Sequence, residues 1–177
     1  NEYCQPFYFV EIYDGNERIE LFRILPSTGQ RSAQIQRTRY QCEHVLATLL
    51  DDVLFQYHQI GNLGVYTRQV LQYILDRQSV TRWQLGDVEF THQFEYNWEN
   101  SNLLGALFSV PKPFVDTYQW TFDTTSYPWT VNLVRPSNQE QARIRYGRNM
   151  RGIKRDEDPS NLVNRIFALG YGEGVNQ

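Results

Sequence analysis

Two alternating apolar runs in the second half of the chain restrict the fold more than any other feature. Every second position is apolar in both runs: Tyr118, Trp120 and Phe122 in the first, and Trp129, Val131 and Leu133 in the second. A period of two is the pattern of a β-strand with one buried face. The polar stretch "DTTSYP", residues 123–128, lies between the runs. The pattern therefore predicts an antiparallel hairpin with a longer loop.

A second hairpin is predicted near the start of the chain. Phe7–Tyr13 and Arg18–Leu25 are rich in aromatic and aliphatic residues and flank "DGN", Asp14–Asn16. An Asp-Gly pair between two apolar runs favours a tight hairpin turn. Pro26–Gln30 then interrupts the strand pattern. In residues 40–44, every second position alternates with a polar residue, which predicts a short strand.

Three segments between the hairpins show helical spacing. The first carries Val45, Leu46, Leu49, Leu50, Val53, Leu54 and Tyr57 and ends before Gly61–Gly64. The second begins at a Thr67 cap and carries Val70, Leu71, Ile74 and Leu75. The third begins at a Ser101 cap, carries Leu103, Leu104, Leu107 and Phe108, and ends at "VPKP", Val110–Pro113.

Residues 83–90 separate the second and third helical segments. Apolar and polar residues alternate on either side of Gly86 and Asp87, which predicts a strand with a bulge or a second hairpin. The elements together predict an α+β fold in which antiparallel hairpins pack with two or three short helices. We expect one set of helix residues to be buried against a sheet bearing Trp120 and Trp129: Val45, Leu49, Val53, Val70 and Ile74.

Composition excludes several classes of protein. The 177 residues are 41% hydrophobic and 15% aromatic, enough for one compact domain or two small ones. A net charge of -3 offers no basic surface for a phosphate backbone, so we expect no specific nucleic-acid binding. No apolar run approaches the ~18 residues of a membrane helix. We interpret Cys4 and Cys42 as free thiols, although a single bridge between them stays open.

The sequence contains a near match to a phosphate-binding loop. Gly147 and Gly152 have the required spacing, but Ile153 stands at the lysine position and no serine or threonine follows it as a magnesium ligand. We predict no cofactor site there and interpret the glycines as a bend or a close backbone approach in a strand.

Metal and nucleophile candidates are few. His44, His58, His92 and Cys42 are too scattered for a zinc site of three or four ligands, although Cys42 and His44 share one face of a predicted strand. The serines lack a G-x-S-x-G turn. We predict no metal site and no catalytic residues among them.

Carboxylates and aromatic rings leave two alternatives open. Asp51 with Asp52, Glu95 with Glu99, and Asp156–Asp158 could serve a glycosidase, or could be solvated helix and turn residues. The aromatic residues could form a sugar-binding platform, or the sheet core and a subunit interface. Because most of them follow the apolar period of predicted strands, we favour the core and the interface.

Four longer segments resemble one known family, the prophage tail proteins, also called prophage endopeptidase tail or phage minor structural proteins. They are Cys42–Phe55 ("CEHVLATLLDDVLF"), Phe94–Val110, Tyr118–Leu133 and Ile144–Gly174. The last is the most specific: a strand similar to Ile-x-Tyr-Gly-x-Asn, a basic and acidic stretch, and an apolar strand that ends in glycine. The resemblance extends from about Gln41 onward.

The resemblance implies a tail-tip or baseplate hub that closes the tail tube. The implied assembly is a homotrimer of the full-length protein that contacts the distal tail ring and the tape-measure protein and carries fibre or lytic modules. Residues 1–35 would be partial β-barrel strands, residues 36–137 an inserted α+β domain, and residues 138–177 the return strands. Because the chain begins at Asn1 and ends soon after Leu162–Leu169, we expect a segment of a longer protein.

The implied location is the tail tip of the virion, with assembly in the host cytoplasm. Where family members are lytic, the activity usually lies further downstream, so we expect no enzymatic activity here. The alternative is a cell-wall-degrading or glycan-binding tail domain. A hydrolase requires a concave pocket with converging titratable groups, whereas a hub requires broad surfaces and symmetry.

Overall fold

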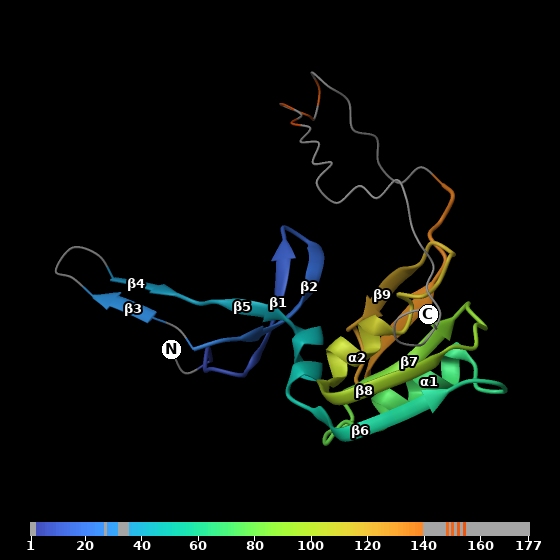
Figure 1. Ribbon diagram of the computed structural model, residues 1–177. Coiled ribbons are helices and arrows are strands. Elements are labelled where there is room, and N and C mark those ends of the chain that lie inside the picture. The colour runs from blue at the N-terminus through green and yellow to red at the C-terminus, as the bar shows by residue number, and fades with distance from the viewer. Residues whose placement is uncertain are drawn as a thin grey trace. The chain divides into compact units, whose positions relative to one another are not determined.

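The computed structural model describes residues 3–26, 28–31 and 36–139, together with residues 148, 150, 152 and 154. These residues form a mixed α+β fold, mostly strands with a few short helices, and the sheets are not closed into a barrel (Figure 1). The contacts divide the chain into two units, Asn1–Ser137 and Asn138–Gln177. All the elements below belong to the first unit. Most of the predicted return strands, the phosphate-loop residues Gly147 and Ile153, and Asp156–Asp158 lie outside the described residues.

The elements follow one another along the chain in a strand-rich order. The strands are β1 (Phe9–Asp14), β2 (Glu17–Ile24), β3 (Thr28–Arg31), β4 (Gln36–Arg39), β5 (Cys42–His44), β6 (Val53–Gly61), β7 (Trp83–Val88), β8 (Glu95–Asn102), β9 (Gln119–Asp123) and β10 (Trp129–Val134). The helices are a 3₁₀ helix, η1 (Val45–Leu50), and the α-helices α1 (Thr67–Leu75) and α2 (Leu103–Ser109).

The first predicted hairpin is confirmed. Strands β1 and β2 pair antiparallel, with Asp14 opposite Glu17 and Gly15 in the turn at a φ of 60°. That backbone conformation is readily available only to glycine. Strand β5 adds to the other edge of β2, and β3 pairs with β4 in a separate ribbon. The expected break over Pro26–Gln30 is therefore wrong from Thr28 onward, where β3 begins.

The second predicted hairpin is also confirmed. Strand β10 pairs antiparallel with β9, with Val131 opposite Phe122 and Leu133 opposite Trp120. On its other side β10 pairs parallel with β7, and the register shifts at Gly86–Asp87. This is the bulge predicted from the sequence.

The predicted helix over residues 45–57 is wrong. Its first half is the single 3₁₀ segment η1, and its second half is strand β6, which pairs with β8. The Asp52 side chain accepts hydrogen bonds from the Ser79 backbone and hydroxyl, and the Asp52 carbonyl accepts one from Leu103. The chain is thus held in a turn between η1 and β6. Long-range strand pairing therefore overrides the local helical spacing, and Val53 is exposed rather than buried.

The other two predicted helices are confirmed as α1 and α2, but each cap differs from the prediction by one residue: the α1 cap lies one residue before the expected Thr67, and the α2 cap lies one residue after the expected Ser101. Tyr66 precedes α1, and its backbone N–H donates to Gln69 Oε1 at 2.8 Å. Asn102 caps α2 by accepting a hydrogen bond from the Gly105 N–H at 2.7 Å. Such side-chain bonds satisfy backbone donors that the first helical turn leaves free.

One hydrophobic core joins these elements. It contains Val45 and Leu49 of η1, Leu54 of β6, and the inner faces of both α-helices and of the β7–β10–β9 sheet. Trp83 lies at its centre, with its Nε1–H donating to Thr48 Oγ1 at 3.1 Å. The expected burial of Val45, Leu49, Val70 and Ile74 is confirmed. Trp129 is buried in the same core, and Trp120 is partly buried against it.

Candidate interaction site

The β1–β2 hairpin exposes apolar side chains on both of its faces. We call this set the hairpin apolar surface, with members that are 36–61% exposed: Phe7, Tyr8, Phe9, Ile12, Tyr13 and Ile19. Successive residues of a strand point to opposite faces, so neither face of β1 is fully covered. Strand β1 is also an edge strand, because β2 is its only partner among the described residues. An exposed apolar edge strand is typical of a surface that a partner covers.

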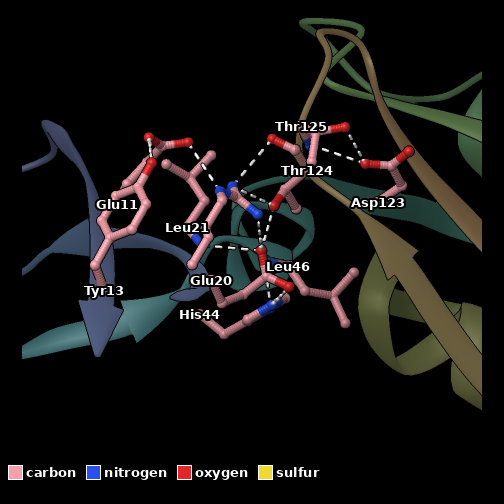
Figure 2. A network of polar contacts seen from close by, with 10 residues as sticks. Glu11, Tyr13, Glu20, Leu21, His44, Leu46, Asp123, Thr124 and Thr125 are labelled. Carbon is pink, nitrogen blue, oxygen red and sulfur yellow. Dashed lines mark hydrogen bonds and ion pairs between the residues drawn. The ribbon is translucent and has the colours of Figure 1, made fainter. Parts of the chain in front are cut away.

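A polar network ties this hairpin to the loop between β9 and β10 (Figure 2). Arg18 of β2 donates through Nη2 to Thr124 Oγ1 at 2.8 Å and through Nε to Glu11 at 3.0 Å. The Thr124 hydroxyl also donates to Glu20 Oε1, and this carboxylate accepts the Leu21 N–H at 2.9 Å. We call Glu11, Arg18, Glu20, His44 and Thr124 the polar junction. It holds β2 against a loop that is about a hundred residues away in sequence.

Glu20 is the carboxylate at the centre of the polar junction. Partial burial opposes its ionisation, but hydrogen bonds from Thr124 and from the Leu21 backbone outweigh burial and lower its pKa. His44 lies beside it, with Nε2 at 3.8 Å from Glu20 Oε2. Because His44 Nδ1 accepts the Leu46 N–H at 3.1 Å, a neutral ring carries its proton on the nitrogen that faces Glu20. His44 therefore serves as a helix cap and a junction residue.

A second ionic cluster fixes the inner end of β2. The Arg23 side chain is only 11% exposed; its Nε donates to Glu43 at 2.7 Å and its two terminal nitrogens hold Asp51. The hydrogen bond with Asp51, followed by that with Glu43, raises the pKa of the Arg23 guanidinium. Planar, bidentate pairing of this kind suits arginine and carboxylate. The cluster thus joins β2, β5 and the end of η1.

A histidine–carboxylate pair lies on another part of the molecule. His92 Nε2 is 2.9 Å from Asp116 Oδ2, and Arg135 donates to Asp116 Oδ1 at 2.7 Å. The hydrogen bond from Arg135 is the largest contribution that lowers the Asp116 pKa. The His92 ring packs 4.5 Å from the Phe114 ring. Hydrolases orient a base in this way, but no hydroxyl or thiol of the described residues hydrogen-bonds to His92.

The structure does not bring the other histidines and cysteines of the sequence analysis together. His58 bonds to the Tyr73 hydroxyl at 2.8 Å and to the Phe55 carbonyl. Cys4 and Cys42 are not joined by a disulfide bond. Within the described ranges, no group of three or more His, Cys, Asp or Glu residues could hold a metal ion.

The two carboxylates of each predicted pair also have different surroundings in the structure. Asp51 pairs with Arg23, whereas Asp52 holds Ser79. Glu95 accepts a hydrogen bond from Gln59 on the exposed side of the β6–β8 ribbon, where Glu99 is also exposed. Asp51, Asp52 and Glu95 thus act as local structural acceptors.

Sequence reasoning missed the residues that carry the polar junction and the ionic cluster. One signal was present: Arg18, Glu20 and Arg23 interrupt an apolar strand and are partly or fully buried in the fold. Charged residues are almost never buried without a partner. Thr124 had no such signal, because its role depends on which strand its loop meets.

None of the helices in the described part of the chain has the length and apolar character needed to cross a membrane. Residues 52–127 match the family model described as the prophage endopeptidase tail domain. The matched segment begins just before β6 and ends in the loop after β9. Comparisons with curated proteins and with solved structures found no match. The family match confirms the resemblance to the prophage tail proteins, and it indicates a structural role for this chain in a phage tail.

Proposed function

We propose that this chain is a structural segment of the tail-tip hub of a bacteriophage or prophage. The hub closes the tail tube and links the distal tail ring to fibre or lytic modules. The observation that carries the proposal is the match of residues 52–127 to the prophage endopeptidase tail domain. The full-length protein acts as a homotrimer in the virion, next to the tape-measure protein, after assembly in the host cytoplasm.

The hairpin apolar surface supports this role. A hub segment is expected to present broad apolar surfaces and open strand edges that neighbouring subunits cover. The described sheets are open, and β1 offers an edge with exposed side chains on both faces. The polar junction holds this hairpin on the core, so the surface is presented in a defined orientation. Specific nucleic-acid binding is not part of the proposed role.

The location can be tested by electron microscopy of intact particles. Antibodies raised against the purified chain should label the tail tip and leave the capsid and the length of the tube unlabelled. Antibodies against the tube protein provide the matched control, because they should label the shaft. Labelling along the shaft, or at the capsid, would show that this chain is not part of the tip.

We also propose that this chain has no hydrolytic activity of its own, although the family description contains the word endopeptidase. The His92–Asp116 pair lacks a described nucleophile, and Arg135 already occupies the other Asp116 oxygen. Purified chain should release no peptide or sugar from host cell walls above a buffer control. Release that Asp116→Asn abolishes would instead establish the cell-wall-degrading alternative.

A further inference from the structure

A recess opens beside the base of the hairpin. It has a volume of about 350 Å³ and is lined by Phe7, Phe9, Arg23, Thr48, Asp51 and Arg82. We call it the Arg82 recess. Its volume suits one or two amino-acid side chains and is at the small end of ligand pockets. Its wall combines two aromatic rings with three charged groups, so it favours an occupant that is partly apolar and partly charged.

Most polar groups of the wall are already paired. Arg23 is held by Asp51 and Glu43, and both Asp51 oxygens accept from Arg23. Thr48 Oγ1 accepts the indole N–H of Trp83. These internal bonds leave Arg23 and Asp51 little capacity for a new ligand.

Arg82 differs from the other charged residues of the wall. Its backbone N–H donates to Gln78, but no hydrogen bond or ion pair joins its guanidinium to another described residue. The residue is half-buried and directly precedes β7. A guanidinium has five N–H donors in a planar arrangement that matches a carboxylate. The recess therefore presents a cation with free donors next to apolar rings.

The aromatic side of the recess is held in an unusual conformation. Phe7 has a φ of 68°, a backbone conformation that is rare for a bulky side chain. The Phe7 N–H donates to the Ile24 carbonyl at 2.7 Å, and its ring lies 5.9 Å from the Arg23 guanidinium. Phe9 packs edge-on against Trp129, with 5.2 Å between ring centroids. Both rings are thus positioned by the fold while remaining largely exposed.

The surroundings of the recess favour a polypeptide over a free small molecule. Phe7 and Phe9 belong both to the recess and to the hairpin apolar surface, which continues along the open edge of β1. An extended segment can pair with such an edge and place alternate side chains into pockets. A small carboxylate would use the recess and leave the adjoining apolar side chains uncovered.

We propose that the Arg82 recess binds an aspartate or glutamate side chain of a second polypeptide that lies along β1. The carboxylate pairs with the Arg82 guanidinium, and the hydrocarbon part of the ligand packs against Phe7 and Phe9. Charge complementarity selects the acidic residue, and the edge of β1 supplies the remaining contact.

The test uses matched probes and matched variants. The probes are a short acetylated and amidated β-forming peptide with a central aspartate, its asparagine counterpart, and succinate. Binding is followed by the NMR signals of the Trp83 and Trp129 indole N–H groups, since Trp83 bonds to Thr48 and Trp129 contacts Phe9. The variants are Arg82→Gln and, as a control with the same charge change, Lys112→Gln. Lys112 is exposed and lies outside the recess.

The aspartate peptide should bind about tenfold more tightly than the asparagine peptide, as expected for one charge-assisted bidentate contact. Arg82→Gln should remove this difference, and Lys112→Gln should preserve it. Thermal unfolding should be similar for both variants, because no described bond depends on the Arg82 guanidinium.

Four results would overturn the proposal. The first is equal or absent binding of the two peptides, and the second is an unchanged preference in Arg82→Gln. The third is binding of succinate as tight as that of the aspartate peptide, which would assign the recess to small carboxylates. Self-association that Arg82→Gln abolishes, in the absence of any peptide, would assign the occupant to a second copy of this chain instead of a different polypeptide.

Discussion

Replacement of Trp83 by alanine is expected to lower the free energy of unfolding by about 4 kcal/mol. Trp83 is 1% exposed and packs edge-on against the rings of Trp129 and Phe122 at centroid distances of 5.5 and 6.1 Å. Its indole N–H is bonded to Thr48 of η1, so the side chain links β7, the β9–β10 sheet and the 3₁₀ helix. The alanine variant leaves a large cavity that rigid neighbours fill only in part.

The matched control for Trp83 is Trp120→Ala. Trp120 is only partly buried and contacts Phe108 at the side of the core. When both variants are compared by urea titration, the loss of Trp120 should cost about 1–2 kcal/mol. If Trp83→Ala does not fold, Trp83→Phe gives a second measurement, with a loss of about 1–2 kcal/mol for the missing hydrogen bond and smaller ring. Equal losses at positions 83 and 120 would contradict the central place of Trp83 in the core.

Replacement of Gly61 by alanine is expected to cost at least about 3 kcal/mol. Gly61 ends β6 with a φ of 111°, and a Cβ added there would overlap the backbone oxygen of Phe94. That oxygen belongs to the backbone and accepts the Asn62 N–H at 3.2 Å, so it cannot move independently of the β6–β8 ribbon. The variant must therefore either open the end of the ribbon or remain strained.

Gly64→Ala separates the two causes of this loss. Gly64 also has a positive φ, 85°, but nothing lies within 4 Å of its added Cβ. Its substitution should cost only about 1–2 kcal/mol, from the left-handed backbone alone. A loss at Gly61 no larger than that at Gly64 would argue against the close pairing of β6 with β8, and so against the strand that replaces the predicted helix.

Local patterns predicted those elements whose partners lie nearby in sequence. The hairpins β1–β2 and β9–β10 are each joined by one loop, so alternation and turn residues such as Gly15 were sufficient. Helices α1 and α2 satisfy their backbone within one segment, and their apolar stripes were visible. The bulge at Gly86–Asp87 was predicted for the same reason, because it interrupts an alternating run.

Strands β6 and β8 show where local reasoning fails. Residues 45–57 carry apolar side chains at helical spacing, yet β6 forms because β8 supplies its hydrogen-bond partners from about forty residues away. No element was predicted over residues 95–102. The Asp52 contacts with Ser79 and Leu103, which separate η1 from β6, also depend on distant segments.

The sequence by itself determined the α+β class, two hairpins, two helices and the resemblance to the prophage tail proteins, because each of these rests on periodicity or on contiguous residue patterns. Only the tertiary structure revealed the polar junction, the Arg23 cluster and the Arg82 recess. Arg18 meets Thr124, and Phe7 lines one recess with Arg82, although these pairs are far apart along the chain. Short-range pattern carries no information about such pairs, since their geometry is set by which strands the core brings together.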